Sequence, residues 1–140
     1  MKLRDPMGLD IYAETLIYAY EHPENSGAIS DADAKMHEEN ISCGDKLTIY
    51  LKIEEGHISR ARFAGSGCVI SMGSAEMLTD FLTGKSLAEI ESMGREELLK
   101  LIGIDPGPVR MHCATLSLRA TKKAIFGMQG KPVDVKTKEL

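Results

Sequence analysis

The sequence has no apolar run that approaches the roughly 18 residues needed to span a bilayer, and it does not open on a charged-then-apolar leader. It has no long run of Lys and Arg either, since 17 basic residues stand against 21 acidic ones, for a formal charge of -4. A mildly acidic chain of this kind is a poor candidate for binding nucleic acid through its phosphates. These absences favour a cytoplasmic protein of 140 residues with neither a membrane nor a nucleic acid as partner.

Cysteine is also scarce, with three in the chain, and an odd number is a poor basis for a disulfide framework. Cys43 and Cys68 are 25 positions apart, Cys68 and Cys113 are 45 apart, and there is no CxxC pair. This spacing excludes zinc fingers, zinc ribbons, rubredoxins and ferredoxins. A free cysteine is most often a small buried hydrophobe, so the main question is whether these three fill a core or carry chemistry.

The period of the apolar residues changes along the chain. Alternation over residues 47–53 and 57–63, joined by a turn, predicts a hairpin, and a shorter strand is expected over 35–39. Helical spacing predicts helices over 8–21, 68–82, 86–93, 95–102 and 109–126. Together they predict one α+β domain over residues 1–140, a small three-stranded antiparallel sheet flanked by about five helices, with 1–7 and 129–140 flexible.

All three cysteines fall at the ends of predicted elements, whereas core cysteines more often lie within them. Cys43 is in a turn before the central strand, Cys68 begins a helix, and Cys113 is in the first turn of the last predicted helix. A helix N-terminus favours the thiolate, which is the form that binds metal and attacks sulfur. The glycines beside Cys43 and Cys68 leave room for a bulky inorganic group.

Two other potential ligands accompany the cysteines. Asp45 is two residues after Cys43, and His112 directly precedes Cys113. Three thiolates with a carboxylate or an imidazole would suit zinc or iron–sulfur chemistry. Neighbouring residues on a regular helix point about 100° apart, so His112 and Cys113 share a site only if the helix start is irregular or the two alternate. The residues leave open whether Asp45 or His112 is the fourth ligand.

In these contexts the sequence resembles the U-type iron–sulfur cluster assembly scaffolds, namely IscU, SufU and the N-terminal domain of NifU. The likeness spans roughly Tyr12 to Met128 and is nearest to the IscU type, because the interval between the second and third cysteines is short and His112 is present. The segments that carry it are Tyr20-Glu21-His22-Pro23-Glu24-Asn25-Ser26-Gly27, Asn40-Ile41-Ser42-Cys43-Gly44-Asp45, Phe63-Ala64-Gly65-Ser66-Gly67-Cys68-Val69-Ile70-Ser71 and Val109-Arg110-Met111-His112-Cys113-Ala114.

The resemblance implies a SufE/NifU-like fold and a non-enzymatic scaffold. Such proteins accept persulfide sulfur from a cysteine desulfurase, accept iron, build a labile [2Fe-2S] cluster and pass it to apo-proteins. Carried over to this chain, the ligands are Cys43, Cys68 and Cys113 with Asp45 or His112, and Cys113 is the sulfur acceptor. The resemblance also implies that zinc can occupy the same pocket in the cluster-free protein.

Further expectations concern partners. Tyr12 matches a tyrosine implicated in the pairing of scaffold protomers, which implies a homodimer. The Leu-Pro-Pro-Val-Lys motif that a dedicated chaperone recognises is replaced here over Pro106–Arg110, so the resemblance does not carry chaperone recognition over to this chain. The alternative function is a zinc-dependent sulfur acceptor for a cysteine desulfurase, and a third alternative is a structural domain with inert buried thiols.

Overall fold

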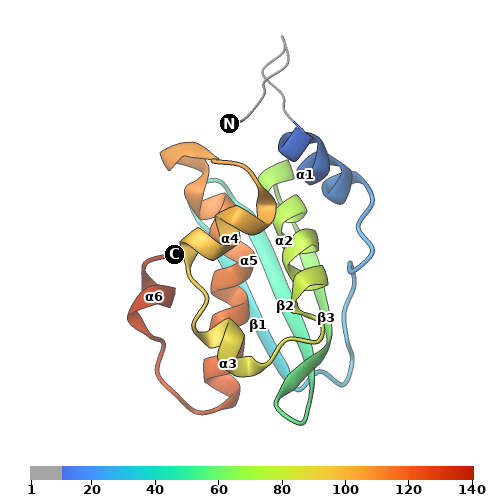
Figure 1. The fold of residues 1–140 in the computed structure, drawn as a ribbon, viewed down its shortest axis with the longest axis vertical. Helices are drawn as coiled ribbons and strands as arrows, with labels where there is room; N and C mark the ends of the chain where they lie inside the picture. The colour runs from blue at the N-terminus through green and yellow to red at the C-terminus, as the bar shows by residue number, and fades with distance from the viewer. Residues whose placement is uncertain (1–10) are drawn as a thin grey trace.

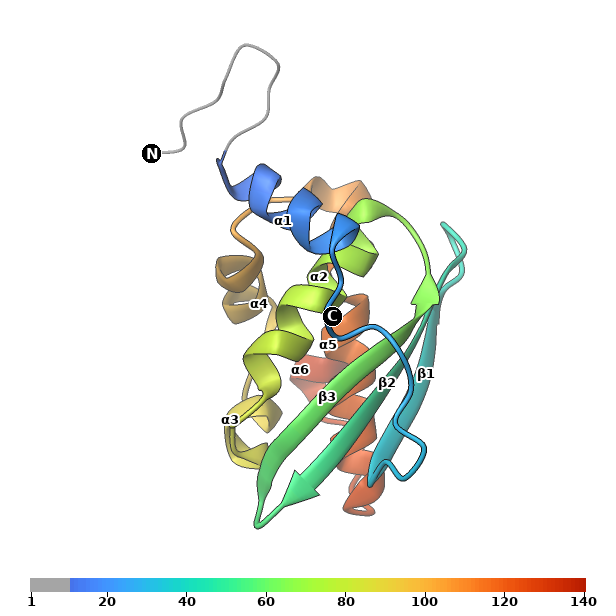
Figure 2. The ribbon, with the colours of Figure 1, turned by 90° about the vertical axis from the view of Figure 1, so that its right-hand side faces the viewer.

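A three-stranded antiparallel sheet, in the order β1-β2-β3, lies against a layer of helices in the computed structural model, which describes residues 11–140 (Figures 1 and 2). The strands are β1 (Ala34–Asn40), β2 (Asp45–Glu54) and β3 (His57–Ser66). The helices are α1 (Ile11–Glu21), α2 (Val69–Leu82), α3 (Leu87–Glu91), α4 (Arg95–Ile102), α5 (Gly107–Met128) and α6 (Val135–Lys138). The predicted α+β class is confirmed. Within the described residues, no helix combines the length and apolar character that crossing a bilayer requires.

Alternation of side chains along the strands creates the core. Leu47, Ile49 and Leu51 on β2 are fully buried, whereas the residues between them are half-buried on the other face. In a strand, successive side chains point to opposite faces, so one face of the sheet is apolar and must be covered. The helices α2 and α5 cover it and contact each other (Figure 1).

Strand register brings distant parts of the chain to one end of the sheet. Asn40 pairs with Asp45 across the β1–β2 turn, and Lys46 pairs with Ser66 at the end of β3. The β1–β2 turn and the β3–α2 connection therefore lie at the same end of the sheet, as Figure 2 shows. Because Cys43 is in the turn and Cys68 follows the connection, the register places two cysteines near each other.

The helix α5 begins at Gly107 rather than at the predicted Val109, and so includes Pro108 in its first turn. Proline is tolerated there because the first backbone N–H groups of a helix have no intrahelical partner. The predicted break before this helix is therefore too long by two residues. As a result, Cys113 is the seventh residue of α5 and lies in its second turn, which corrects its predicted place in the first turn.

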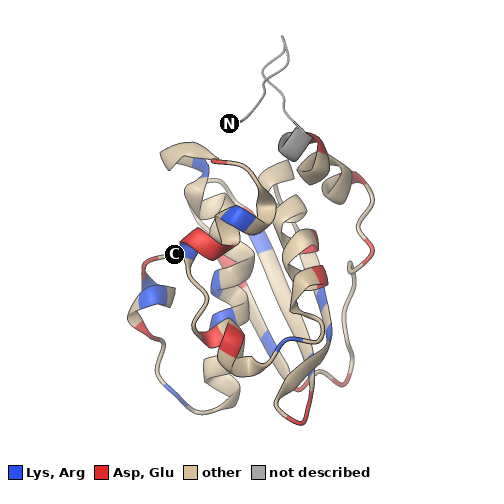
Figure 3. Ribbon diagram, in the orientation of Figure 1, with Lys and Arg blue, Asp and Glu red and all other residues tan. Residues whose placement is uncertain are grey.

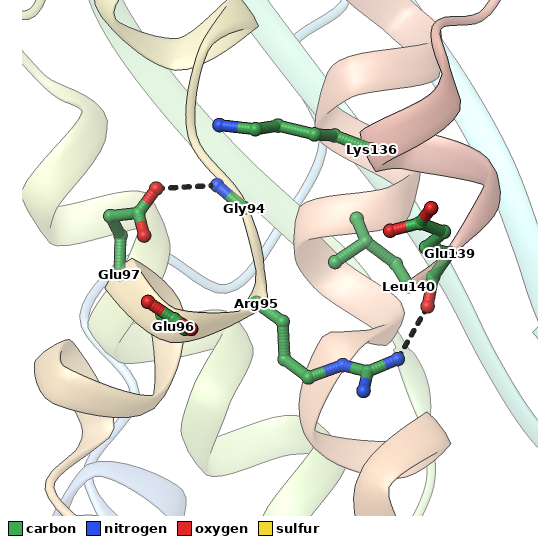
Figure 4. Close-up of a pocket in the computed structure, with 7 residues that line it drawn as sticks. All are labelled: Gly94, Arg95, Glu96, Glu97, Lys136, Glu139 and Leu140. Atoms are coloured by element: carbon green, nitrogen blue, oxygen red, sulfur yellow. Dashed lines mark hydrogen bonds between the residues drawn. The ribbon is translucent and has the colours of Figure 1, made fainter.

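The segment after α5 is packed, although the sequence predicts a flexible tail from residue 129. It forms α6, and Thr137 and Leu140 are buried. Figure 3 shows basic residues of this segment beside acidic ones of the preceding helices, and Lys131 lies 3.6 Å from Glu91. At a cavity of about 630 Å³ beside the start of α4, Arg95 donates to the carbonyl oxygen of Glu139 at 2.5 Å (Figure 4).

A buried lysine on α5 explains much of this packing. Lys122 is fully buried, and its Nζ donates to the carbonyl oxygen of Met93 at 2.6 Å and lies 3.7 Å from Asp134 Oδ1. Burial lowers the pKa of Lys122, and the Asp134 carboxylate opposes that shift. Asp134 also caps α6, because its Oδ1 accepts from the backbone N–H of Thr137 at 2.9 Å. The sequence pattern could not reveal this contact, since the lysine and its partners come from three separate segments.

The replacement Asp134→Ala should lower the free energy of unfolding by about 1–2 kcal/mol, because it removes the α6 cap and leaves the buried Lys122 without its carboxylate. Urea unfolding followed by circular dichroism measures the change. Glu139→Ala is the control, since the Glu139 side chain is exposed, and its effect should stay within about 0.5 kcal/mol. Equal stability of Asp134→Ala and the wild type would contradict an anchored C-terminal segment.

Candidate metal centre

Three side chains from different elements meet at this end of the sheet. Cys43 comes from the β1–β2 turn, Asp45 begins β2, and Cys113 comes from α5. The Sγ atoms of Cys43 and Cys113 are 3.3 Å apart, and Cys43 Sγ is 3.0 Å from Asp45 Oδ2. One ligand atom of each residue lies within 4.8 Å of the other two, which is close enough for all three to contact one metal ion.

Cys68 adds a third thiol beside this group. It is the N-cap of α2, and its Sγ accepts from the backbone N–H of Ser71 at 3.4 Å. The same Sγ lies 3.8 Å from Asp45 Oδ2. The carboxylate therefore contacts both Cys43 and Cys68. The four potential ligands are three thiol sulfur atoms and one carboxylate oxygen.

The thiols line a cavity of about 610 Å³ that opens at the surface. Their exposure is graded, because Cys43 is exposed, Cys68 is half-buried and Cys113 is 1% exposed. Seven other residues line the cavity. They are Ser42, Gly44, Asp45, Ser66, Gly67, Val109 and Arg110.

The Asp45 side chain is held as a carboxylate. It is 3% exposed, and burial alone would raise its pKa. Hydrogen bonds from the Ser71 hydroxyl, the cysteine thiols and the backbone N–H of Cys68 outweigh burial and keep the pKa of Asp45 below its usual value. Asp45 is therefore ionised at neutral pH and offers the cavity a negatively charged oxygen.

A glycine makes room for this carboxylate. A Cβ atom on Gly67 would lie 2.8 Å from Asp45 Oδ1, which is too close for any side chain to be accommodated without movement. Gly67 lines the cavity, and the Asp45 side chain occupies the direction in which a Cβ atom of this residue would point. Gly67 therefore permits the close approach of β2 to the start of α2.

The thiols differ in how readily they ionise. Burial works against ionisation of Cys68, but contact with the Ser71 hydroxyl and the hydrogen bond from the Ser71 N–H outweigh it and lower the pKa of this thiol. Burial raises the pKa of Cys113 well above its usual range, and its contacts with Cys43 and Asp45 act in the same direction. The prediction that a helix start would favour the thiolate therefore agrees with Cys68 but is wrong for Cys113.

The two candidates for a fourth ligand, Asp45 and His112, lie in different places relative to the thiols. Asp45 lies among the thiols, whereas His112 is exposed and, within the described residues, belongs neither to the group of close ligand atoms nor to the cavity lining. On the regular helix α5, His112 points away from the side that carries Cys113, as adjacent helical residues do. The side chain of Tyr12 lies outside the described part of the structure.

Sequence reasoning missed two residues at the site. Ser71 is fully buried and contacts both Asp45 and Cys68, and Asn40 donates from Nδ2 to Cys113 Sγ at 3.7 Å. A signal existed for Ser71, because a residue three positions after an N-cap is the usual donor to that cap. No local pattern pointed to Asn40, since its contact with Cys113 depends on how β1 packs against α5.

Comparisons with known proteins identify similar sequences. The sequence model of the family described as the NifU-like N terminal domain matches residues 11–135. The zinc-dependent sulfurtransferase SufU of Bacillus subtilis is 30% identical over 137 residues, covering 86% of this chain and 92% of SufU. The iron-sulfur cluster assembly scaffold protein IscU 1 of Archaeoglobus fulgidus is 32% identical over 133 residues, covering 93% of this chain and 85% of IscU 1.

Solved structures share the fold. A putative iron-sulfur cluster assembly scaffold protein for the SUF system from Fervidobacterium islandicum superposes with a TM-score of 0.72 at 22% sequence identity. The match covers 82% of this chain and 96% of that one. The match confirms the predicted arrangement of sheet and helices.

Alkylation should distinguish the three thiols. In the folded, metal-stripped protein at pH 7, iodoacetamide should modify Cys43 and Cys68 at least about tenfold faster than Cys113, because Cys113 is buried and its pKa is raised. Peptide mass spectrometry over time measures the three rates. Protein unfolded in urea is the control and should show similar rates at all three positions. Rapid modification of Cys113 in the folded protein would contradict this description of the site.

Proposed function

Because the chain belongs to the NifU-like N-terminal domain family, we propose that it is a scaffold on which iron–sulfur clusters are assembled and from which they pass to apo-proteins. The observation that carries the proposal is the meeting of Cys43, Asp45 and Cys113, with Cys68 beside them, in a cavity open to the surface. The name of the Archaeoglobus relative supports the same function. The scaffold role involves no catalysed turnover, so we propose a protein that is not itself an enzyme.

The cluster is the cargo of the site, and we propose that it is of the [2Fe-2S] type. Cys43, Cys68 and Cys113 would supply thiolates and Asp45 would supply the fourth ligand, a donor set that suits iron–sulfur clusters and tetrahedral zinc. A carboxylate is a harder ligand than a thiolate and suits such iron less well. Asp45 is therefore the position at which the cluster would detach first.

Sulfur would arrive as a persulfide from a cysteine desulfurase, and Cys113 is the proposed acceptor. Cys113 is 1% exposed, and its Sγ is in contact with that of Cys43. Access to Cys113 therefore requires the exposed β1–β2 turn to move aside. A homodimer through Tyr12 rests on the family resemblance alone, and the resemblance does not extend to recognition of Pro106–Arg110 by a chaperone. The proposed location is the cytoplasm.

A second function is favoured by one specific observation. The Bacillus subtilis relative is named a zinc-dependent sulfurtransferase, and three thiolates with one carboxylate also form a complete tetrahedral zinc site. In that case, the same residues would accept sulfur from the desulfurase around a resident zinc ion and would never hold a cluster. Metal analysis of protein purified without oxygen separates the two, because stoichiometric zinc retained against an iron supply favours the second function.

Anaerobic reconstitution tests the scaffold proposal. With ferrous iron, a cysteine desulfurase, cysteine and a thiol reductant that reduces the persulfide sulfur to sulfide, the wild-type protein should develop the absorption and Mössbauer spectra of a bound cluster. The variant Cys43→Ala should lose most of this signal, because it removes one of the three thiolates. The matched control is Ser74→Ala, which changes a buried side chain of α2 away from the cavity. Absence of any cluster in the wild type, or wild-type behaviour of Cys43→Ala, would refute the proposal.

Replacement of the carboxylate should alter release. In Asp45→Ala, the lifetime of the bound cluster in the presence of an apo-acceptor should be several-fold longer, on the order of threefold, because the labile ligand position is removed. Decay of the cluster absorption measures the lifetime. Asp80→Ala, which removes an exposed carboxylate of α2 that does not line the cavity, should leave it unchanged. A shorter lifetime in Asp45→Ala would count against Asp45 as the weak ligand.

A further inference from the structure

Ser71 is a fully buried residue whose hydroxyl and backbone N–H both contact potential ligands of the candidate metal centre. Its hydroxyl donates to Asp45 Oδ2 and lies 3.2 Å from Cys68 Sγ, and its backbone N–H donates to the same sulfur at 3.4 Å. Ser71 is the third residue of α2, so these contacts come from the first turn of a helix with fixed geometry. One residue thus contacts both an oxygen ligand and a sulfur ligand.

The two oxygens of Asp45 are held by donors from the same turn. Oδ1 accepts from the backbone N–H of Cys68 at 3.2 Å, and Oδ2 accepts from the Ser71 hydroxyl. Oδ2 also faces the thiols of Cys43 and Cys68. Those thiols must lose their protons to bind a metal, so they can no longer donate to the carboxylate in the loaded site. The N–H of Cys68 and the hydroxyl of Ser71 are then the donors that keep the carboxylate in place.

We propose that Ser71 is a positioning residue of the metal site. Its hydroxyl holds Asp45 Oδ2 toward the thiols and so increases the affinity of the site for a metal ion. The proposal rests on the ligand role of Asp45 in the proposed function. Without the hydroxyl, the Asp45 side chain keeps only its bond through Oδ1 and can rotate about its terminal torsion. Residues that orient a ligand in this way typically contribute about 10- to 100-fold to metal affinity.

A neighbouring serine provides a matched control. Ser74 lies one turn further along α2 and is also fully buried, but its hydroxyl has no hydrogen-bond partner among the described residues and it does not line the cavity. Replacing either serine by alanine removes the same atom from a buried position of the same helix. Only the Ser71 replacement removes a bond to a potential ligand, so the comparison separates positioning from helix packing.

Cobalt(II) binding to the metal-stripped full chain tests the proposal without iron, sulfide or desulfurase. The d–d absorption of cobalt(II) reports coordination number and the balance of sulfur and oxygen ligands, and a titration gives the dissociation constant. Ser71→Ala should bind cobalt(II) about tenfold more weakly than the wild type, with an altered d–d spectrum. Ser74→Ala should remain within about twofold of the wild type and keep its spectrum. Circular dichroism establishes that each variant is folded.

A double variant shows whether Ser71 affects cobalt(II) affinity through Asp45. In an Asp45→Ala background, adding Ser71→Ala should change the affinity by less than about twofold, because the group that Ser71 positions is absent. An equal loss in both backgrounds would show that Ser71 acts through Cys68 or the helix, and would overturn the proposal. Unchanged affinity in Ser71→Ala would overturn it as well.

The outcomes for this inference and for the scaffold function are separable. A protein that shows the cobalt(II) coupling between Ser71 and Asp45 but builds no cluster refutes the scaffold function and leaves the positioning role intact. A protein that builds a cluster but shows no coupling refutes the positioning role alone.

Discussion

The attachment of the Asp45 carboxylate to the first turn of α2 is the interaction on which the site depends. It joins the start of β2 to a helix that follows 23 positions later, through the N–H of Cys68 and the hydroxyl of Ser71. Gly67 is required for it, because any side chain there would occupy the space of the carboxylate. This contact places Cys68 and Cys43 on either side of the same carboxylate oxygen, Asp45 Oδ2.

The three thiols are unequal because each comes from a different kind of structure. A turn leaves Cys43 exposed, a helix N-cap lets Ser71 stabilise the thiolate of Cys68, and the second turn of α5 buries Cys113 against Asn40. Burial raises the pKa of both Cys68 and Cys113. The contacts with Ser71 reverse this effect and lower the pKa of Cys68, whereas nothing reverses it for Cys113. A site built from such thiols is not symmetric, and Cys68 is better prepared than Cys113 to bind a cation in the free protein.

The sequence predicts correctly those helix bounds that depend on residues close together in the chain. The bounds of α4 are as predicted, because helix starts and ends depend on neighbouring residues. The start of α5, the packing of the segment around Thr137 and the contacts of Ser71 were not predicted. They depend on which segments meet in space, and burial of Cys113 with contacts to Cys43 and Asp45 is what raises the pKa of this thiol.

The arrangement also limits what must move when the site is loaded or emptied. Asp45 and Cys68 are fixed to the start of α2, and Cys113 belongs to a helix whose buried face forms much of the core. Cys43, by contrast, lies in an exposed four-residue turn, in which Gly44 has a φ of 76° that favours glycine. Displacement of that turn uncovers Cys113 and breaks no packing of the buried face of the sheet. With three potential ligands on fixed elements and one on a turn, the proposed site can open on one side while the fold remains intact.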